Sequence, residues 1–244
     1  MKVLTFFTVR GGSGKTVLSA AFASYASYIL GKRTMVLDFD GPEYNLYNMR
    51  LRELSLMKEG DADCDKDGLY IVEKVENTDS ESLDRFAASI MRIKEQFDYI
   101  ILDFPGSFSK DDAICHLATA EVIDMVVIPV ELDAISICSA KTLSQIFGET
   151  GLKTLPFFNR VHGKEDPALY NRLREWFERH GVRVSEATVK NSIAMKREMG
   201  TKGFLRSTVC FPEKEIRAKN PGIINLFEEI VRYEERGVQT TEDS

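Results

Sequence analysis

The sequence has few of the residues that usually bind metals or cross-link small extracellular domains. It contains four cysteines and three histidines among 244 residues. The cysteines are Cys64, Cys115, Cys138 and Cys210, and no two follow the Cys-x-x-Cys spacing of a zinc or redox motif. Scattered cysteines without a signal-peptide pattern favour reduced thiols over a disulfide framework. We therefore expect a cytoplasmic protein.

Long apolar runs are also lacking. No stretch approaches the roughly 18 apolar residues that a membrane span needs. The chain runs from Met1-Lys2 directly into its first apolar segment, so we expect neither a targeting peptide nor an N-terminal DNA-binding domain. These absences predict a protein with no membrane partner.

The sequence does contain enough apolar side chains for one α/β domain. The chain is 43% hydrophobic and carries a net charge of −6. We predict a single domain over residues 1–236, followed by a polar tail at 237–244. The charge is uneven, because residues 183–219 hold nine basic and four acidic side chains. Such asymmetry indicates a local basic surface.

A glycine-rich stretch at 10–16 is the most informative part of the sequence. It reads Arg-Gly-Gly-Ser-Gly-Lys-Thr and lies between an apolar run at 3–9 and a helix-forming segment at 17–23. A strand, a glycine turn and a helix in this order are typical of a phosphate-binding loop. The usual spacing Gly-x-x-x-x-Gly-Lys-Thr needs a glycine at position 9, where this chain has Val9. The loop is therefore a deviant form of the motif.

The residue types of this loop suit a nucleoside triphosphate. Glycine allows backbone conformations in which successive N–H groups surround an anion, and the N-terminus of the following helix adds positive charge. Lys15 would contact the β- and γ-phosphates, and the hydroxyl of Thr16 would ligate Mg²⁺. The residues predicted to bind ATP here are Gly11, Gly12, Ser13, Gly14, Lys15, Thr16 and Val17.

The stretch resembles the deviant Walker A motif of the ParA/MinD family of dimeric ATPases, which reads Lys-Gly-Gly-x-Gly-Lys-Thr/Ser. Arg10 stands where the family has its leading lysine. The resemblance implies a doubly wound α/β fold with a mainly parallel sheet and helices on both faces. It also implies a homodimer that forms on ATP binding, in which Arg10 reaches the partner's nucleotide and takes part in catalysis. Arginine keeps the charge of that lysine and adds a planar fork of donors.

The apolar run at 34–40 ends in two acids, Asp38 and Asp40. Ligands of parallel sheets bind at the carboxyl ends of the strands, so these acids are predicted to lie beside the phosphate loop. The resemblance makes this stretch the family's first switch, in which Asp40 orients the attacking water and contributes to the Mg²⁺ site, and Asn45 is a switch residue. The alternative is that both acids merely end a strand in a solvated turn.

A second apolar run, at 97–104, also contains an acid near its end. Asp103 resembles the Walker B aspartate of the family, which would hold Mg²⁺ through water and position Thr16. Residues 104–108 would then form the second switch. The alternative is an ordinary aspartate at the end of a strand.

Hydrophobic periodicity predicts the remaining helices and strands. Helices are expected at 44–58, from Asp79 or Ser80 to about 96, at 111–120, at 133–147, from Asp166-Pro167 onward, at 192–199 and at 221–236. Strands are expected at 68–72, 122–130, 152–161 and from 181. In the helix at 133–147 we expect Ile135, Cys138 and Ile146 to face the core.

Asn159 lies near the end of the predicted strand at 152–161. In the family an asparagine at this point pairs with the adenine edge, because an amide can donate and accept hydrogen bonds at once. The resemblance therefore assigns adenine recognition to Asn159. The alternative is an asparagine in a turn.

The last predicted helix and the basic segment before it bear on the partners. The helix has an acidic polar face, which anionic lipid would repel, so we expect it to cover the core rather than bind a membrane. ParA-like proteins bind DNA without sequence preference through basic residues on late helices, and such phosphate contacts need only positive charge. The candidates are Lys190, Lys196, Arg197, Lys202 and Arg206. The alternative is a solvated basic face without a ligand.

Together these residues predict an ATPase with ATP and Mg²⁺ as cofactors. The resemblance implies a switch that ATP closes and slow hydrolysis opens, acting in plasmid or chromosome partition or in the transfer of a mobile element. It also implies a ParB-like or other activating protein. Three other interpretations stay open: a MinD-like positioning ATPase, a P-loop ligase of the dethiobiotin-synthetase type and an ATP-binding scaffold that scarcely hydrolyses.

Overall fold

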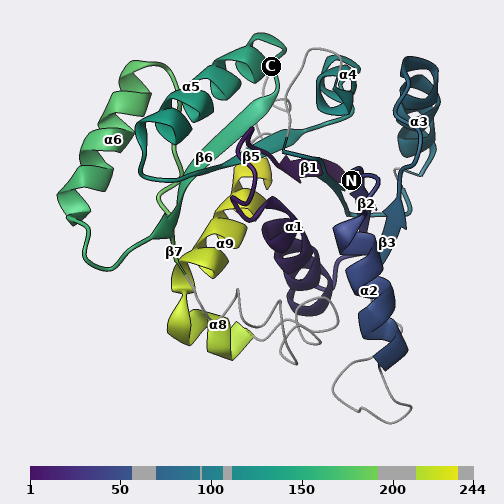
Figure 1. The fold of residues 1–244 in the computed structure, drawn as a ribbon, viewed down its shortest axis with the longest axis horizontal. Helices are drawn as coiled ribbons and strands as arrows, with labels where there is room; N and C mark the ends of the chain where they lie inside the picture. The colour runs from purple at the N-terminus through teal and green to yellow at the C-terminus, as the bar shows by residue number, and fades with distance from the viewer. Residues whose placement is uncertain (57–69, 94, 107–111, 192–212, 236–244) are drawn as a thin grey trace.

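The computed structural model describes residues 1–56, 70–93, 95–106, 112–191 and 213–235. Its framework is a seven-stranded parallel sheet in the order β3-β2-β4-β1-β5-β6-β7. The strands are β1 (Lys2–Phe6), β2 (Thr34–Asp38), β3 (Ile71–Lys74), β4 (Tyr99–Asp103), β5 (Met125–Val130), β6 (Lys153–Val161) and β7 (Thr188–Lys190). Helices cover both faces (Figure 1), which confirms the predicted doubly wound α/β fold.

Two layers of helices enclose the sheet. One layer contains α1 (Lys15–Ser24) with its π-helical continuation η1 (Tyr25–Ile29), α2 (Asn45–Leu56), α8 (Glu213–Lys219) and α9 (Pro221–Glu235). The other contains α3 (Ser80–Arg92), α4 (Ala113–Thr119), α5 (Ala134–Glu149) and α6 (Pro167–Arg179). Figure 1 shows α1 and α9 side by side under the central strands. The first and last helices of the fold therefore share one core.

The central strands are buried on both faces, which explains their continuous apolar sequences. All five residues of β4 and all six of β5 are buried. Alternate residues of a strand face opposite sides of the sheet. In β1, Leu4 and Phe6 pack on the α1 side, whereas Val3 packs on the opposite side. The sheet thus separates two hydrophobic cores.

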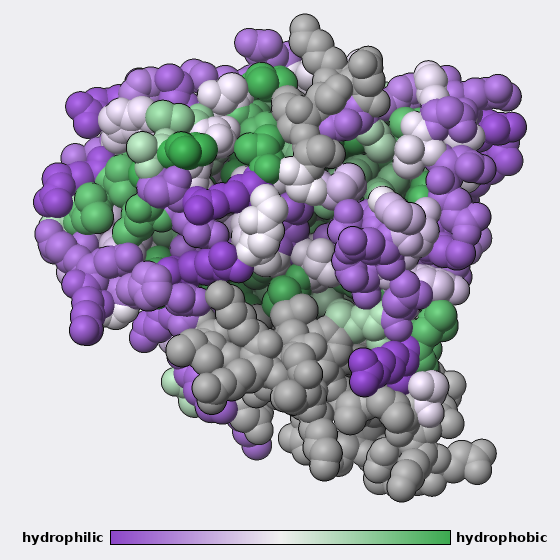
Figure 2. Space-filling view, in the orientation of Figure 1, coloured by the Kyte–Doolittle hydropathy of each residue, from purple (hydrophilic) through white to green (hydrophobic). Residues whose placement is uncertain are grey.

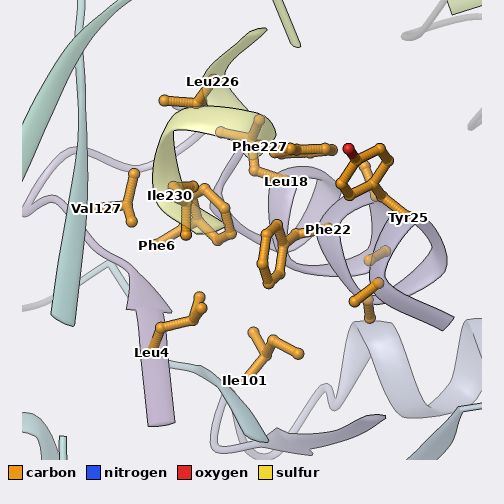
Figure 3. Packing of buried hydrophobic residues seen from close by; sticks show 14 of the residues in the cluster. Leu4, Phe6, Leu18, Phe22, Tyr25, Ile101, Val127, Leu226, Phe227 and Ile230 are labelled. Carbon is orange, nitrogen blue, oxygen red and sulfur yellow. The ribbon is translucent and has the colours of Figure 1, made fainter. Parts of the chain in front are cut away.

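The core on the α1 side is rich in aromatic rings (Figure 3). Phe22 of α1 lies edge to face with Phe227 of α9, with 5.3 Å between the ring centroids, and with Phe6 of β1 at 6.1 Å. Tyr25 of η1 contacts Phe227 at 5.4 Å. Each such pair contributes about 0.5–1.5 kcal/mol beyond the burial of its area. These contacts fix α1, and with it the loop that precedes α1, against the sheet.

The last helix covers this core as predicted. Five of its apolar residues have no exposed surface: Ile223, Ile224, Leu226, Phe227 and Ile230. The start of α9 packs tightly on β7, because a Cβ added at Gly222 would lie 1.8 Å from the carbonyl oxygen of Thr188. A side chain at this position would have to displace backbone atoms.

Aspartates begin three of the helices by accepting hydrogen bonds from backbone N–H groups. Asp79, Asp133 and Asp166 cap α3, α5 and α6 in this way. Such a cap typically stabilises a helix by about 1 kcal/mol. The helix starts predicted at Asp79 and Asp166 are confirmed.

The predicted inner face of α5 is wrong. Ile135 is 77% exposed, Ile146 is 39% exposed and Cys138 is also exposed. The residues of α5 that are buried are Ser136, Ala140, Leu143, Ser144 and Phe147. Three of these five residues are small, so the hydrophobic pattern of the sequence does not mark this face as the buried one. Figure 2 shows patches of hydrophobic side chains among hydrophilic ones over α5 and α6.

Some predicted boundaries also differ. The strand expected from residue 181 forms only at β7, and α3 ends at Arg92 rather than near 96. Helix α8 is not expected from the sequence, and the helix predicted at 192–199 lies outside the described residues. Within the part of the chain that the structure describes, no helix is long and apolar enough to cross a membrane.

Candidate functional site

The carboxyl ends of three neighbouring strands meet at one edge of the sheet. β4 lies between β1 and β2, and the register pairs Asp38 at the end of β2 with Asp103 at the end of β4. The glycine loop leaves β1 at this edge and leads into α1. The chain continues from β1 to β2 on one side and from β4 to β5 on the other. Parallel α/β sheets bind ligands at such a point of divergence.

The glycine loop has the backbone that a phosphate site requires. Gly12 and Gly14 have φ angles of +71° and +92°, which other residues rarely adopt. Gly14 is the N-cap of α1, no side chain caps this helix, and its first turn contains no acidic residue. The N-terminal amides of α1 are therefore left for an anion.

Lys15 lies inside the loop with only 8% of its surface exposed. Its Nζ donates to the carbonyl of Arg10 at 3.3 Å. Burial lowers the pKa of Lys15, and the charges of Asp103 and Asp40 act in the opposite direction. The loop thus holds the lysine charge where phosphates would lie.

Asp103 is completely buried beside the start of α1. Its Oδ1 accepts from Ser19 Oγ at 3.0 Å, and Thr16 also donates to the carboxyl group. Its Oδ2 is buried and has no hydrogen-bond partner in the described part of the chain. Burial, followed by the charge of Asp38, raises the pKa of Asp103 to about 7.

Asp38 and Asp40 differ in their surroundings. Asp38 is buried, and its oxygens accept from the backbone N–H groups of Asp40 at 2.9 Å and of Leu46 and Tyr47 at 3.0 Å. This carboxyl group therefore holds the loop after β2 and the start of α2 together. Asp40 is only half-buried, and burial together with the charge of Asp38 raises its pKa.

Asn45, the predicted switch residue, begins α2 and is exposed. Its side-chain amide donates to Glu43 at 2.9 Å. Asn45 thus directly follows the loop that Asp38 fixes, and its role as a switch residue stays a prediction.

These groups fit a hard divalent cation. Mg²⁺ usually keeps several waters and takes one or two carboxylates together with phosphate oxygens. The unpartnered Oδ2 of Asp103, the hydroxyl of Thr16 and the half-buried Asp40 form such a set. The described residues contain no group of three or more histidine, cysteine, aspartate or glutamate side chains that could hold a metal. One carboxylate oxygen, one hydroxyl group and a second carboxyl group suit a cation that phosphate oxygens also hold.

The predicted second switch comes close to the glycine loop at Gly106. A Cβ added there would lie 3.0 Å from Nζ of Lys15 and 3.4 Å from Cα of Gly11. Glycine at this position leaves room for the lysine. Residues 107–111, which complete the predicted switch, lie outside the described residues.

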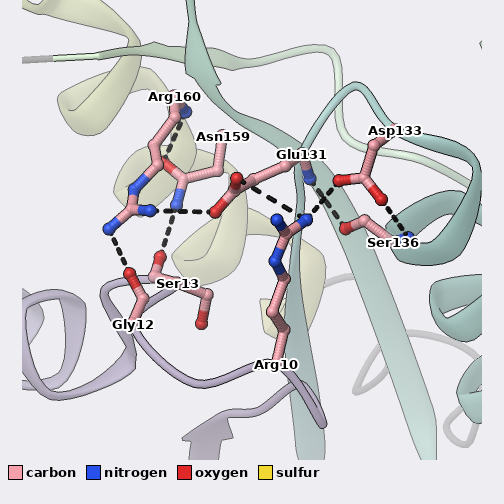
Figure 4. Close-up of polar contacts among 8 residues, drawn as sticks. All are labelled: Arg10, Gly12, Ser13, Glu131, Asp133, Ser136, Asn159 and Arg160. Atoms are coloured by element: carbon pink, nitrogen blue, oxygen red, sulfur yellow. Dashed lines mark hydrogen bonds and ion pairs between the residues drawn. The ribbon is translucent and has the colours of Figure 1, made fainter.

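Arg10 lies at the mouth of the loop and is paired within the same chain (Figure 4). Its Nη1 donates to Oδ2 of Asp133 and lies 3.8 Å from Oε2 of Glu131. Both acids belong to the turn between β5 and α5. The side chain of Arg10 is 46% exposed. Its contact with a partner's nucleotide stays a prediction.

Asn159 lies against the loop and within β6, not in a turn. Its Nδ2 donates to the carbonyl of Ser13 at 2.9 Å, and its Oδ1 accepts from the backbone N–H of Arg160 at 3.0 Å. The residue is 6% exposed. The predicted role of Asn159 in adenine recognition stays a prediction.

The sequence alone does not single out four residues of this site: Ser19, Glu131, Asp133 and Arg160. Ser19 follows Thr16 by three positions and so shares its face of α1, which is a signal the sequence carries. Glu131 and Arg160 become neighbours of the loop only because the sheet places the end of β5 next to β1 and the end of β6 one strand further away.

Lys190 lies in the described part of the predicted DNA-binding segment. It is exposed at the end of β7, and its backbone exchanges hydrogen bonds with the side chain of Asn220 at 2.9 and 3.0 Å. The other four candidates, Lys196, Arg197, Lys202 and Arg206, lie outside the described residues.

Comparison with known proteins agrees with this geometry. A chain from Methanocaldococcus jannaschii described as an uncharacterized ATP-binding protein is 28% identical over 160 residues, and the match spans 60% of each chain. A second uncharacterized ATP-binding protein of that organism is 27% identical over 235 residues, which cover 80% of this chain and 84% of the relative.

Solved structures show the same fold at low sequence identity. A chain of the MinC:MinD cell division protein complex of Aquifex aeolicus gives a TM-score of 0.67 at 17% identity, covering 95% of this chain and 96% of that one. A plasmid partition protein of Borrelia burgdorferi gives 0.60 at 14% identity, with 95% and 98% covered. The family model of the ATPase MipZ matches residues 2–150, more than half of the sequence. The chain therefore belongs to the MipZ family of ATPases, within the ParA/MinD group of deviant Walker A ATPases.

Proposed function

We propose that this protein is an ATP- and Mg²⁺-dependent dimerisation switch that hydrolyses ATP slowly and acts in DNA partition or in the transfer of a mobile element. The observation that carries the proposal is the meeting of the glycine loop, Lys15 and Asp103 at the carboxyl ends of β1 and β4. Membership of the MipZ family supports the ATPase part of the proposal.

Each residue of the site has a separate task in this proposal. The loop amides and Lys15 bind the phosphates, and Thr16 and Asp103 hold the Mg²⁺ site. Bound Mg²⁺ supplies positive charge that neutralises the phosphate oxygens. Asp40 orients the attacking water, because its backbone is already fixed by Asp38 at 2.9 Å.

Arg10 links nucleotide state to dimerisation. Its pairing with Asp133 and Glu131 keeps the guanidinium within its own chain when no partner is present. In an ATP-loaded pair, Arg10 of the partner subunit would lie against the phosphates and stabilise the charge that develops during hydrolysis. Hydrolysis then removes the group that holds Arg10 there, and the pair separates.

The switch is tested by measuring molar mass in solution with no nucleotide, with ADP and with ATP, each in the presence of Mg²⁺. The wild type should be monomeric with ADP and dimeric with ATP. Lys15→Ala should lose nucleotide binding, and Asp40→Ala should stay dimeric because it binds ATP without hydrolysing it. Tight ATP binding by Lys15→Ala would remove the phosphate loop from the proposal.

The role in DNA partition needs a separate test, because the fold is shared with proteins of different tasks. Retention of a DNA fragment by the wild type should require ATP and fall steeply with salt. Charge reversal at Lys190, Lys196 and Arg197 should weaken it, whereas reversal of the exposed Lys164 should not. An ATP-dependent dimer that retains no DNA would favour a MinD-like positioning role instead. Turnover that requires a carboxylate substrate would favour a ligase.

A further inference from the structure

Two adjacent residues of β6 hold two adjacent carbonyls of the phosphate loop (Figure 4). The side-chain amide of Asn159 donates to the carbonyl of Ser13 at 2.9 Å, and Nη2 of Arg160 donates to the carbonyl of Gly12. β5 lies between β6 and β1 in the sheet, so both side chains reach past the end of β5 to meet the loop. The contact joins segments that are 146 residues apart in the chain.

These contacts set the direction of the loop's N–H groups. In a trans peptide the C=O and N–H bonds point in opposite directions. When the carbonyls of Gly12 and Ser13 are held toward β6, the N–H groups of Ser13 and Gly14 must point away from it. An anion-binding nest needs successive N–H groups that face one point. The side chains from β6 therefore fix the peptides that would contact phosphate.

Arg160 is itself held firmly in place. Its Nη1 donates to Oε1 of Glu131 at 3.0 Å, and its backbone N–H donates to Oδ1 of Asn159 at the same distance. Its φ angle is +55°, a left-handed conformation that is strained for an arginine. Strained backbone persists where the surroundings over-determine it, which is most often at functional sites. Glycine would suit the backbone here, but glycine has no guanidinium group.

We propose that Arg160 is a positioning residue for ATP turnover: with Asn159 it braces the glycine loop so that its amides are arranged for phosphates before nucleotide arrives. The inference rests on the proposed function, since it assumes that the loop binds a nucleoside phosphate. It also gives Asn159 a second task, because its amide donates one hydrogen to Ser13 and accepts one hydrogen bond from Arg160. These two bonds do not use the second N–H and the second lone pair of the amide.

If Asn159 and Arg160 brace the loop through these hydrogen bonds, which we call the brace, Arg160→Gln should show a specific kinetic signature. Glutamine is too short to contact Gly12 and Glu131 together and carries no charge. Loss of a charge-assisted hydrogen bond should weaken binding of Mg²⁺-ADP by roughly tenfold or more. Because loop amides contact the phosphates both before and during the reaction, KM for ATP should rise while kcat changes little. Arg160→Lys keeps the charge and one donor, so it should restore part of the affinity.

A matched control separates positioning from general stabilisation. Arg174 also donates to backbone carbonyls, those of Ser185 at 3.2 Å and Glu186 at 2.9 Å, and its side chain is 14% exposed. Arg174→Gln should lower the melting temperature without nucleotide and leave the affinity for ADP unchanged. Arg160→Gln should leave the melting temperature without nucleotide unchanged and lower the affinity for ADP. Added ADP should therefore raise the melting temperature of this variant less than that of the wild type.

Titration calorimetry with Mg²⁺-ADP measures the nucleotide affinity of each variant, and melting of the nucleotide-free proteins measures its stability. Together they test the positioning role of Arg160. Wild-type affinity in Arg160→Gln, with Lys15→Ala unable to bind, overturns the brace and leaves the proposed function intact. An affinity loss no larger than that of Arg174→Gln also overturns it. A wild type that binds no nucleotide overturns both proposals. A roughly tenfold loss that Arg160→Lys partly restores supports the brace.

Discussion

The charged form of Asp103 is unfavourable in the protein without a cation and becomes favourable when a cation is bound. Its carboxyl group is fully buried, one oxygen has no partner among the described residues, and the charges of Asp38 and Asp40 lie nearby. These surroundings raise its pKa to about 7, so at lower pH it is protonated. A bound cation would favour the charged form instead.

The raised pKa of Asp103 predicts how the stability of the nucleotide-free protein depends on pH. The pKa of an aspartate in the unfolded chain is about 3.9, so between these values the folded state binds more protons. The stabilising effect of the proton is complete below about pH 4 and is lost as pH rises through about 7. Wild type should lose roughly 2 kcal/mol from this group between pH 5 and 7.

Urea unfolding at pH 5, 6, 7 and 8, without metal, measures this effect as the difference between wild type and Asp103→Asn. The free energy of unfolding of wild type relative to Asp103→Asn should fall between pH 5 and 7 and level off by pH 8. Asp79→Asn is the control, because hydrogen bonds from Ser82 hold the pKa of Asp79 below its usual range, outside the pH range of the series. Parallel curves for wild type and Asp103→Asn would mean that Asp103 stays charged in the empty site.

Gly106 permits a second prediction at the scale of one residue. In Gly106→Ala the new Cβ would approach Nζ of Lys15 to 3.0 Å, so the lysine must move by a few tenths of an ångström. We expect KM for ATP to rise by up to about tenfold, because small displacements of a group that contacts phosphate are costly. Gly163→Ala is the control, since a Cβ there meets nothing within 4 Å. Equal KM values in steady-state assays of the two variants would contradict the expected crowding.

The sequence predicts those site residues whose chemistry and local spacing are both distinctive. Lys15 follows the glycines within one loop, and Asp103 ends an apolar run, so a motif is enough to find them. Arg160 has no such pattern around it. It meets Gly12 only after β6 has been placed two strands from β1 and its own backbone has taken a left-handed turn. Contacts of that kind depend on tertiary structure and not on spacing.

At the scale of elements, apolar spacing locates helices better than it orients them. In α9 the apolar residues are large and contiguous on one face, and this face is the buried one. In α5, Ile135 and Ile146 are exposed, whereas the small residues Ser136, Ala140 and Ser144 are buried together with Leu143 and Phe147. Small side chains carry little signal in a hydrophobic pattern, although close packing requires them.

The contact between α9 and β7 predicts a large effect from a single methyl group. In Gly222→Ala the new Cβ would lie 1.8 Å from the carbonyl oxygen of Thr188, so the helix or the strand must move. We expect a loss of roughly 3 kcal/mol in the free energy of unfolding, as for severe overpacking. Gly148→Ala, in α5, is the matched control. Its Cβ has free space, and alanine should stabilise the helix by about 0.5–1 kcal/mol.

Denaturant unfolding of the two glycine variants checks this prediction. A wild-type midpoint for Gly222→Ala would mean that α9 can slide along β7 without loss of packing. Because α9 contacts α1 through Phe227 and Phe22, the same experiment with added ADP would show whether a displaced α9 also disturbs the glycine loop.

At the scale of the whole molecule, the pairing of Arg10 sets a condition for dimerisation. Arg10 and Asp133 are 46% and 37% exposed, and an exposed ion pair contributes at most about 1 kcal/mol. A partner's phosphates, which carry more charge, could therefore draw Arg10 away from its own chain. In the monomer, the acids of the turn at 131–133 would then hold Arg10 weakly; we call this pairing the latch.

Asp133→Asn tests the latch without removing the helix cap. Asparagine caps helices as well as aspartate does, so residue 133 should still accept from the backbone N–H of Ser136. Arg10 then loses the nearer of its two charged partners and keeps Glu131, at 3.8 Å. In an Asp40→Ala background, sedimentation with ATP should show a dimer dissociation constant lowered by up to about fivefold. Asp166→Asn is the control, because Asp166 likewise caps a helix and pairs with an arginine, Arg172, at 3.7 Å. A dimer no tighter than that of the control would show that the pair does not restrain Arg10. A weaker dimer would place Asp133 in the interface itself, contacting the partner subunit rather than competing with it.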